Sequence, residues 1–192
     1  MKRLISLFAV IALCLSARAE VETYTIDPVH SSAGFTLRHV LSKFSSSFTK
    51  VTGTITVDRA NLENSSVVAS IDVTALNTDN EKRNTHLKSP DFFDTAKFPT
   101  MTFKSTSWKK TGNDTFDVTG ELTIKDVTKP VVLKTTLLGF GSGMGPGSFL
   151  SGWEATTIIK KSEFNMAGPA MLAKALGDDV AVTINVEAGY KK

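Results

Sequence analysis

The sequence predicts an all-β fold, an antiparallel barrel or sandwich. Apolar and polar residues alternate with a period of two along much of the chain, which puts alternate side chains on opposite faces of a sheet. Turn-rich stretches such as residues 60–64 and 111–114 separate the alternating segments, and only two short stretches have a helical pattern. A chain of 192 residues with 41% hydrophobic residues can bury the core that such a fold needs.

Residues 1–19 match a secretory signal peptide. A basic start precedes an apolar run over residues 4–15, and an A-x-A cleavage pattern ends at Ala19. The run is too short to span a bilayer, which takes about 20 residues. We therefore expect export with cleavage after Ala19, and a mature chain over residues 20–192 that forms one domain.

Cleavage would change the charge and the redox chemistry of the chain. It would remove three of the 22 basic residues, none of the 19 acidic residues, and the single cysteine, Cys14. The mature chain would carry no net charge, so its composition gives no electrostatic reason to bind nucleic acid or anionic lipid. Without cysteine there is no disulfide, no thiolate nucleophile and no cysteine-ligated metal site. No later segment has the length of a transmembrane helix, so we expect no stable membrane insertion.

About nine segments of the mature chain are predicted as strands. In chain order they cover residues 23–27, 32–39, 51–57, 67–73, 100–109, 116–124, 131–140, 152–161 and 180–188. The segments over 51–57, 67–73, 116–124 and 180–188 alternate most regularly. Such alternation is expected where one face of an antiparallel sheet packs on a core and the other contacts water.

The connections between these strands carry two further predictions. Helices are predicted over residues 79–88 and over residues 170–176, the second directly after Pro169. The Gly-rich stretch over residues 139–147 resembles a phosphate-binding loop. It precedes a predicted strand, however, whereas a phosphate loop needs the N-terminus of a helix. We expect a long flexible connection between two strands there.

Periodicity alone does not distinguish a barrel from a sandwich, or an open cavity from a filled core. The length favours a barrel with room inside, because many sandwich domains need only about 100 residues. Inward-facing small residues such as Gly53, Gly120, Ala69 and Ala155 leave space. The phenylalanine and methionine residues suit an adaptable apolar pocket, but they equally suit an ordinary core.

The sequence contains little that indicates catalysis. The three histidines, His30, His39 and His86, lack the spacing of a metal site, and there is no G-x-S-x-G nucleophile motif. Acidic pairs such as Asp91 with Asp94 are typical of turns and caps. We therefore predict no catalytic residue, no metal site and no cofactor. An enzyme with an unrecognised polar pocket stays open as an alternative.

Several motifs resemble the YceI-like, polyisoprenoid-binding family. The similarity is carried by YTIDPVHSSAGF at residues 24–35, NTHLKSPDFFD at 84–94, GELTIKDVTKP at 120–130, KSEF at 161–164 and GDDV at 177–180. Together with shorter matches they extend over nearly the whole mature chain. Two departures stand out. Asn84 occupies a position where the family usually has Asp, and residues 40–48 are rich in Ser and Phe and fit the family's pattern poorly.

The resemblance implies a lipocalin-like antiparallel β-barrel of about eight strands with one or two short helices. It also implies an elongated apolar cavity that holds a long isoprenoid or another lipid-like chain, in a periplasmic protein that is not an enzyme. We therefore expect an exported carrier. The alternative is a stress-response or interaction module with a filled core and no ligand, and the sequence leaves open whether the protein is a monomer or a homodimer.

Inward-facing strand positions supply the candidate cavity wall. These positions are Phe35, Leu37, Phe48, Met101, Phe103, Leu133 and Trp153. Three basic side chains that could meet a polar head group at a barrel end are Arg38, His39 and His86. For every one of these residues an ordinary core or surface role is the alternative.

Overall fold

The computed structural model of the protein describes residues 21–191, so the predicted signal peptide lies outside the described part. The strands are β1 (Val21–Ile26), β2 (Ser32–His39), β3 (Ser42–Phe48), β4 (Val51–Asp58), β5 (Ser66–Asp72), β6 (Thr100–Lys110), β7 (Thr115–Ile124), β8 (Val127–Ser142), β9 (Ser148–Lys160) and β10 (Leu176–Lys191). One α-helix, α1 (Glu81–Lys88), and four 3-10 turns, η1 (Leu62–Asn64), η2 (Val73–Ala75), η3 (Lys161–Phe164) and η4 (Ala170–Leu172), complete the described elements.

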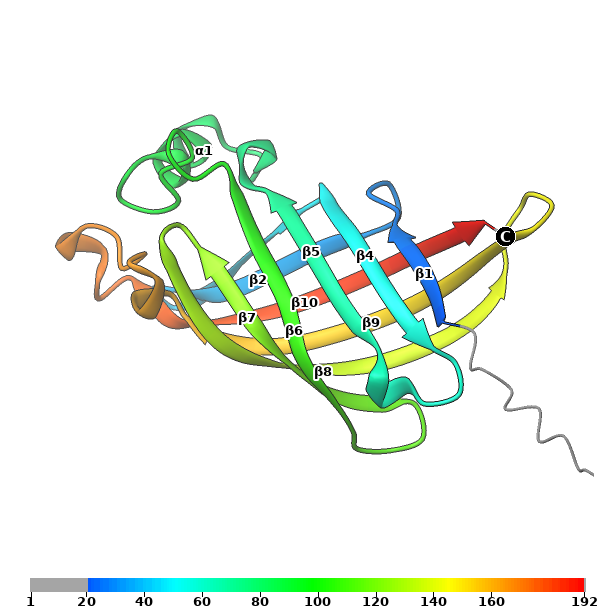
Figure 1. The fold of residues 1–192 in the computed structure, drawn as a ribbon. Coiled ribbons are helices and arrows are strands. Elements are labelled where there is room, and N and C mark those ends of the chain that lie inside the picture. Colours follow the sequence, from blue (N-terminus) through cyan, green and yellow to red (C-terminus); the bar gives the residue numbers. More distant parts are fainter. Residues whose placement is uncertain (1–20, 192) are drawn as a thin grey trace, which may run out of the picture.

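Eight of these strands close into an antiparallel barrel (Figure 1). The order around the ring is β1, β4, β5, β6, β7, β8, β9 and β10. The ring closes where Thr25 and Ile26 of β1 lie opposite Gly189 and Ala188 of β10. The earlier part of β10 pairs with β2, and β3 pairs with β2 in turn, so β2 and β3 extend the sheet at one end. The predicted lipocalin-like barrel is confirmed.

The period of two produces the inner face of the barrel as the sequence predicted. Along β10, Val180, Val182, Ile184 and Val186 all face the interior. The buried apolar residues form two clusters. The first is named the distal cluster because its Trp108 and Phe116 come from the end of β6 and the start of β7, away from α1; it contains Tyr24, Ile26, Ala33, Val51, Ile55, Val57, Trp108, Phe116, Val118, Trp153 and Ala188. A helix-end cluster, beside α1, contains Phe48, Val73, Leu76, Phe92, Phe93, Met101, Ile124, Phe164 and Met166.

The strand β3 was missed by the sequence prediction. Its sequence, SKFSSSF, has three consecutive serines and no run of β-branched residues, so it gives a weak strand signal. In the structure β3 forms a hairpin with β2, in which Phe44 lies opposite Leu37 and Phe48 opposite Ala33. The partner strand, rather than local propensity, therefore holds these residues extended.

Two of the predicted connections differ from expectation. The helix predicted over residues 79–88 is present as α1, but the one predicted over 170–176 is only the 3-10 turn η4, and β10 already begins at Leu176. So short a segment does not meet the cost of nucleating an α-helix. The Gly-rich stretch is not a long connection either, because β8 runs to Ser142 and β9 begins at Ser148.

The helix-end segment is anchored by Asn84, where the family pattern usually has Asp. Asn84 is only 7% exposed, and its Oδ1 accepts hydrogen bonds from the backbone N–H and the hydroxyl of Thr78, at 2.8 and 2.7 Å. Its Nδ2 donates to Oδ1 of Asn77 at 3.1 Å. A buried amide satisfied on both sides fixes α1 to the loop before it.

Gly53 of β4 supports a test of how tightly the barrel wall is packed. Its φ is +143°, and an added Cβ would overlap the carbonyl oxygen of Val68 and lie 2.8 Å from Cα of Ala69 on β5. We expect Gly53→Ala to lower the free energy of unfolding by about 2–4 kcal/mol, because strain and overpacking add. The matched control is Gly145→Ala, where an added Cβ meets nothing within 4 Å. Urea unfolding of both variants measures the difference, and equal stabilities would contradict the packing argument.

Candidate ligand-binding cavity

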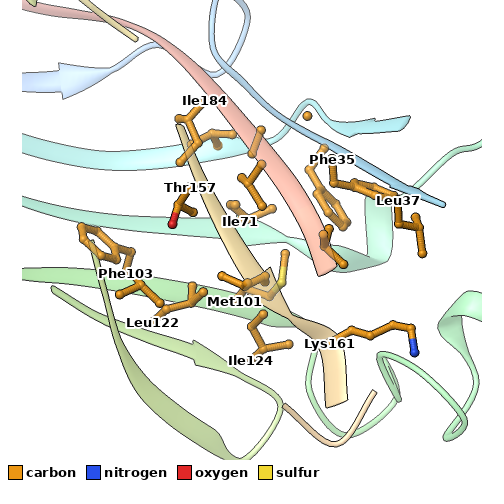
Figure 2. A pocket seen from close by; sticks show the side chains of 18 of the residues that line it. Phe35, Leu37, Ile71, Met101, Phe103, Leu122, Ile124, Thr157, Lys161 and Ile184 are labelled. Carbon is orange, nitrogen blue, oxygen red and sulfur yellow. The ribbon is translucent and has the colours of Figure 1, made fainter. Parts of the chain in front are cut away.

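The barrel encloses a cavity of about 730 Å³ (Figure 2). This volume lies within the range of roughly 300–1,000 Å³ that is typical of small-molecule sites. Its walls come from the inner faces of the strands: Figure 2 shows Ile71, Met101, Phe103, Leu122 and Ile184 around the space. The sequence left open whether the interior is filled, and the structure shows that it is not.

The seven predicted wall residues all line this cavity. Phe35, Phe48 and Met101 pack in or against the helix-end cluster. Phe103, Leu133 and Trp153 pack in or against the distal cluster. The seventh, Leu37, lies near Phe35 (Figure 2). The strand alternation therefore placed these side chains on the correct face.

Part of the lining was not predicted, because it comes from loops. Phe92 and Phe93 follow α1, Met166 follows η3, and Leu172 belongs to η4. Phe44, on the missed strand β3, also lines the cavity. The available signal was the count of phenylalanine and methionine residues outside the predicted strands. That signal does not say which loop folds over the barrel.

The distal end of the barrel is closed by aromatic and charged side chains. The hydroxyl of Tyr24 donates to Oε2 of Glu22 at 2.7 Å, and the ring of Tyr24 packs on that of Tyr190 at 5.0 Å. Burial, more than the adjacent carboxylate, raises the pKa of Tyr24. The guanidinium of Arg59 lies 3.7 Å from the ring centroid of Phe140. These contacts pack the distal end of the barrel, where no exposed residue belongs to the described cavity lining.

The other end of the cavity is its mouth. The exposed lining residues, His39, Ser42, Lys43, Asn80, Lys82, Arg83 and Thr102, all lie at the α1 end. The guanidinium of Arg83, on α1, lies 4.3 Å from the ring centroid of Phe44, on β3. This cation–π contact links the two sides of the mouth.

The charged groups of the described cavity lining are all basic. They are Lys43, Lys82, Arg83 and Lys161, with the titratable His39 and His86, and no Asp or Glu is among them. Lys161 is only 7% exposed. Its Nζ donates to the backbone carbonyl of Ala167 at 3.0 Å and lies 3.9 Å from Oδ1 of Asp178. A hydrogen bond from the hydroxyl of Ser162 is the main reason that the pKa of Asp178 is lowered.

The three predicted head-group residues occupy different positions. His39 and His86 line the mouth, and Nε2 of His86 lies 3.0 Å from Oδ2 of Asp91. Arg38 is not part of the lining. Its Nη1 donates to the backbone carbonyls of Val40 and Lys174 at 3.1 and 3.2 Å. Arg38 and His39 are consecutive in β2, so their side chains leave opposite faces of the sheet.

Trp108 and Trp153 lie in the distal part of the cavity wall. Their rings meet edge to face, with centroids 5.5 Å apart and an interplanar angle of 87°. Both are nearly buried, and their indole N–H groups have no hydrogen-bond acceptor among the described residues. The two rings provide a large apolar surface, at the cost of two unpaired donors.

A group of three possible metal ligands lies apart from the cavity. Asp27, His30 and Glu187 offer ligand atoms within 4.8 Å of one another, and all three are at least partly exposed. Nδ1 of His30 lies 2.8 Å from Oδ2 of Asp27. This hydrogen bond raises the pKa of His30 and lowers that of Asp27. His30 and Asp27 form a surface ion pair in this group.

A closed barrel with one mouth and a long apolar interior defines this chain as a lipocalin-like barrel protein. Residues 24–188 match the YceI-like domain, and the chain belongs to the YceI-like family. It is 37% identical over 188 residues to Protein YceI of Escherichia coli, with 94% of each chain covered. Among the described elements, no helix is long and apolar enough to cross a membrane.

Two solved structures resemble the barrel. BcnA of Burkholderia cenocepacia has a TM-score of 0.74 at 22% identity, with 85% of this chain and 99% of that chain covered. A polyisoprenoid binding domain from Saccharophagus degradans, implicated in plant cell wall breakdown, has a TM-score of 0.65 at 17% identity, with 86% and 97% covered. At identities of 22% and 17%, these two structures support the assignment of the fold alone.

The His30–Asp27 pair supports a pH prediction. The raised pKa of His30 means that the folded state holds the imidazole proton more tightly than the unfolded chain does. The pair therefore stabilises the fold fully only below the ordinary histidine pKa of about 6.5, and the contribution is lost as the pH rises through the raised value. We expect Asp27→Asn to lower the pKa of His30, as measured by NMR titration of its ring protons. An unchanged titration would show that the pair does not form in solution.

Proposed function

We propose that this protein is an exported, non-enzymatic carrier that holds one long apolar chain, of the isoprenoid class, inside the barrel. The observation that carries the proposal is the apolar cavity of about 730 Å³, whose exposed lining residues all lie at the α1 end. Membership of the YceI-like family and the fold shared with a polyisoprenoid binding domain support the ligand class. A module with a solid core, the alternative function, does not account for the cavity.

The energetics of an apolar chain suit this cavity. Burial of each methylene group contributes about 0.8 kcal/mol, so a dozen carbons contribute on the order of 10 kcal/mol before the costs of ordering. We propose Phe35, Leu37, Phe48, Met101, Phe103, Leu133 and Trp153 as wall contacts of the chain. The polar end of the ligand would then lie at the mouth, where His39 and His86 are the proposed contacts. Arg38 acts as a brace of the mouth loops instead.

Export rests on the predicted signal peptide over residues 1–19, and we propose a periplasmic location for the mature barrel. The basic mouth lining suits a ligand whose polar end is neutral or anionic, because a cationic end would meet like charges. Neither feature requires catalysis, and a binding role is sufficient to explain the site.

Native mass spectrometry of protein purified from its own compartment tests the carrier function. We expect a mass above that of the apoprotein, and an isoprenoid-class or other long-chain lipid in the solvent extract. A homogeneous apoprotein mass, with no extractable lipid and no uptake of polyprenol or fatty-acyl probes, would exclude the carrier function.

A substitution that fills the cavity gives a second test. Ala155 on β9 lines the cavity and lies opposite Ile184 of β10. We expect Ala155→Phe to reduce polyprenol uptake by tenfold or more, because the ring occupies the path of the chain, while the barrel still folds. The matched control is Ala181→Phe on β10, at an exposed position that does not line the cavity. Equal uptake by both variants would show that the chain binds elsewhere.

A further inference from the structure

Two loop tips beside the cavity mouth carry large apolar side chains in water. The turn between β2 and β3 consists of Val40 and Leu41, which are 51% and 99% exposed. Met171, in η4, is 85% exposed. The next residues along the chain, Ser42 and Leu172, already line the cavity, so both tips lie at the mouth.

The turn sequence is unfavourable for folding. His39 lies opposite Ser42, so Val40 and Leu41 form a two-residue hairpin loop in which Val40 alone has a positive φ, and glycine is the residue preferred at that first position. Val40 has a φ of +52°, a left-handed conformation that β-branched residues rarely adopt. Leu41 is almost fully exposed, so burial of its side chain does not offset the strain at Val40. Local choices that oppose folding are expected where side chains serve a function.

The two tips are held together as one surface. The backbone N–H of Val40 donates to the carbonyl of Ala175, just after η4, at 2.6 Å. Arg38 adds a second link, because its Nη1 donates to the carbonyls of both Val40 and Lys174. These hydrogen bonds hold the two tips next to each other, so their apolar side chains form one surface.

Basic side chains lie next to these tips in the chain and on α1 across the mouth. Lys43 follows the hairpin turn, Lys174 follows η4, and Lys82 and Arg83 border the same mouth from α1. Of the acidic residues near these cations, Asp79 and Glu81 precede Lys82 in the chain, Asp91 lies against His86 and Asp178 against Ser162, and none of the four lines the cavity. Apolar tips flanked by cations are typical of surfaces that bind the interface of anionic membranes. The neutral net charge of the mature chain does not oppose this, because screening makes the effect local.

We propose that this rim, formed by Val40, Leu41, Met171, Lys43, Lys82, Arg83 and Lys174, docks on the surface of an anionic lipid bilayer. Docking would join the cavity mouth to the apolar layer of the membrane. A long chain could then enter or leave without crossing water. Each methylene group exposed to water lowers the equilibrium constant for transfer of the chain out of an apolar environment by about fourfold. The use in chain transfer rests on the proposed carrier function, whereas the docking itself does not.

The substitution Val40→Gly with Leu41→Asn separates docking from folding. The new turn has the favoured hairpin sequence, so we expect its Tm to equal or exceed that of the wild type. Binding to vesicles of equimolar phosphatidylethanolamine and phosphatidylglycerol, measured by flotation, should fall by about tenfold, because a leucine no longer enters the interface. Met171→Ser should reduce binding in the same direction.

The matched control is Met144→Ser, at the tip of the β8–β9 connection at the opposite end of the barrel (Figure 1). Met144 is fully exposed, so loss of a methionine there tests whether any exposed apolar residue suffices. We expect its vesicle binding to match the wild type. Binding should also weaken in vesicles of phosphatidylcholine alone and at high salt.

Three results would overturn the docking proposal. The first is that the wild type does not bind vesicles. The second is that Met171→Ser and Met144→Ser reduce vesicle binding equally. The third is that the tip variants bind vesicles like the wild type but no longer co-purify with a protein that the wild type retains. The last result would assign the rim to a protein partner. Uptake of a polyprenol probe without vesicles is measured in parallel. Equal uptake by the wild type and the turn variant keeps the carrier function, whereas no extractable lipid and no uptake of polyprenol or fatty-acyl probes by either exclude it whatever the vesicles show.

Discussion

The pairing of β10 with β1 is the interaction on which the rest of the structure depends. Because the last residues of β10 lie opposite Thr25 and Ile26, the sheet has no free edge at the distal end and its inner face surrounds a closed space. The same alternating strands in an open sheet would bury their apolar face against a second layer. The cavity is therefore a consequence of closure, and every wall residue depends on it.

The closed barrel has two ends, and different kinds of side chain lie at each of them. At the distal end, Tyr24, Tyr190 and Phe140 pack together, and Arg59 stacks on the last of them. At the other end, loops and α1 surround an opening with basic side chains and no acidic lining residue among those described. This asymmetry gives the cavity a single mouth, which sets the orientation of any chain that enters it.

The mouth is also where the chain departs from the choices that favour folding. A lysine is buried in the lining, a valine occupies a left-handed turn position, and a leucine is fully exposed. None of these residues closes the barrel or fills its core. Their concentration around one opening sets the mouth apart from the strands, whose inward residues build the barrel wall.

The sequence by itself determined which side of most strands faces inward, because the pleat of a strand is a local property with a period of two. The same rule puts His39 on the inner face with Phe35 and Leu37, and puts Arg38 outside. Only the tertiary structure decided that β10 reaches β1, that the serine-rich β3 is extended, and that Phe92 and Phe93 cover the barrel end. These outcomes depend on pairing between residues far apart in the chain, and the empty volume depends on how all eight strands pack. A local sequence pattern encodes neither the long-range pairing of strands nor the volume that they enclose.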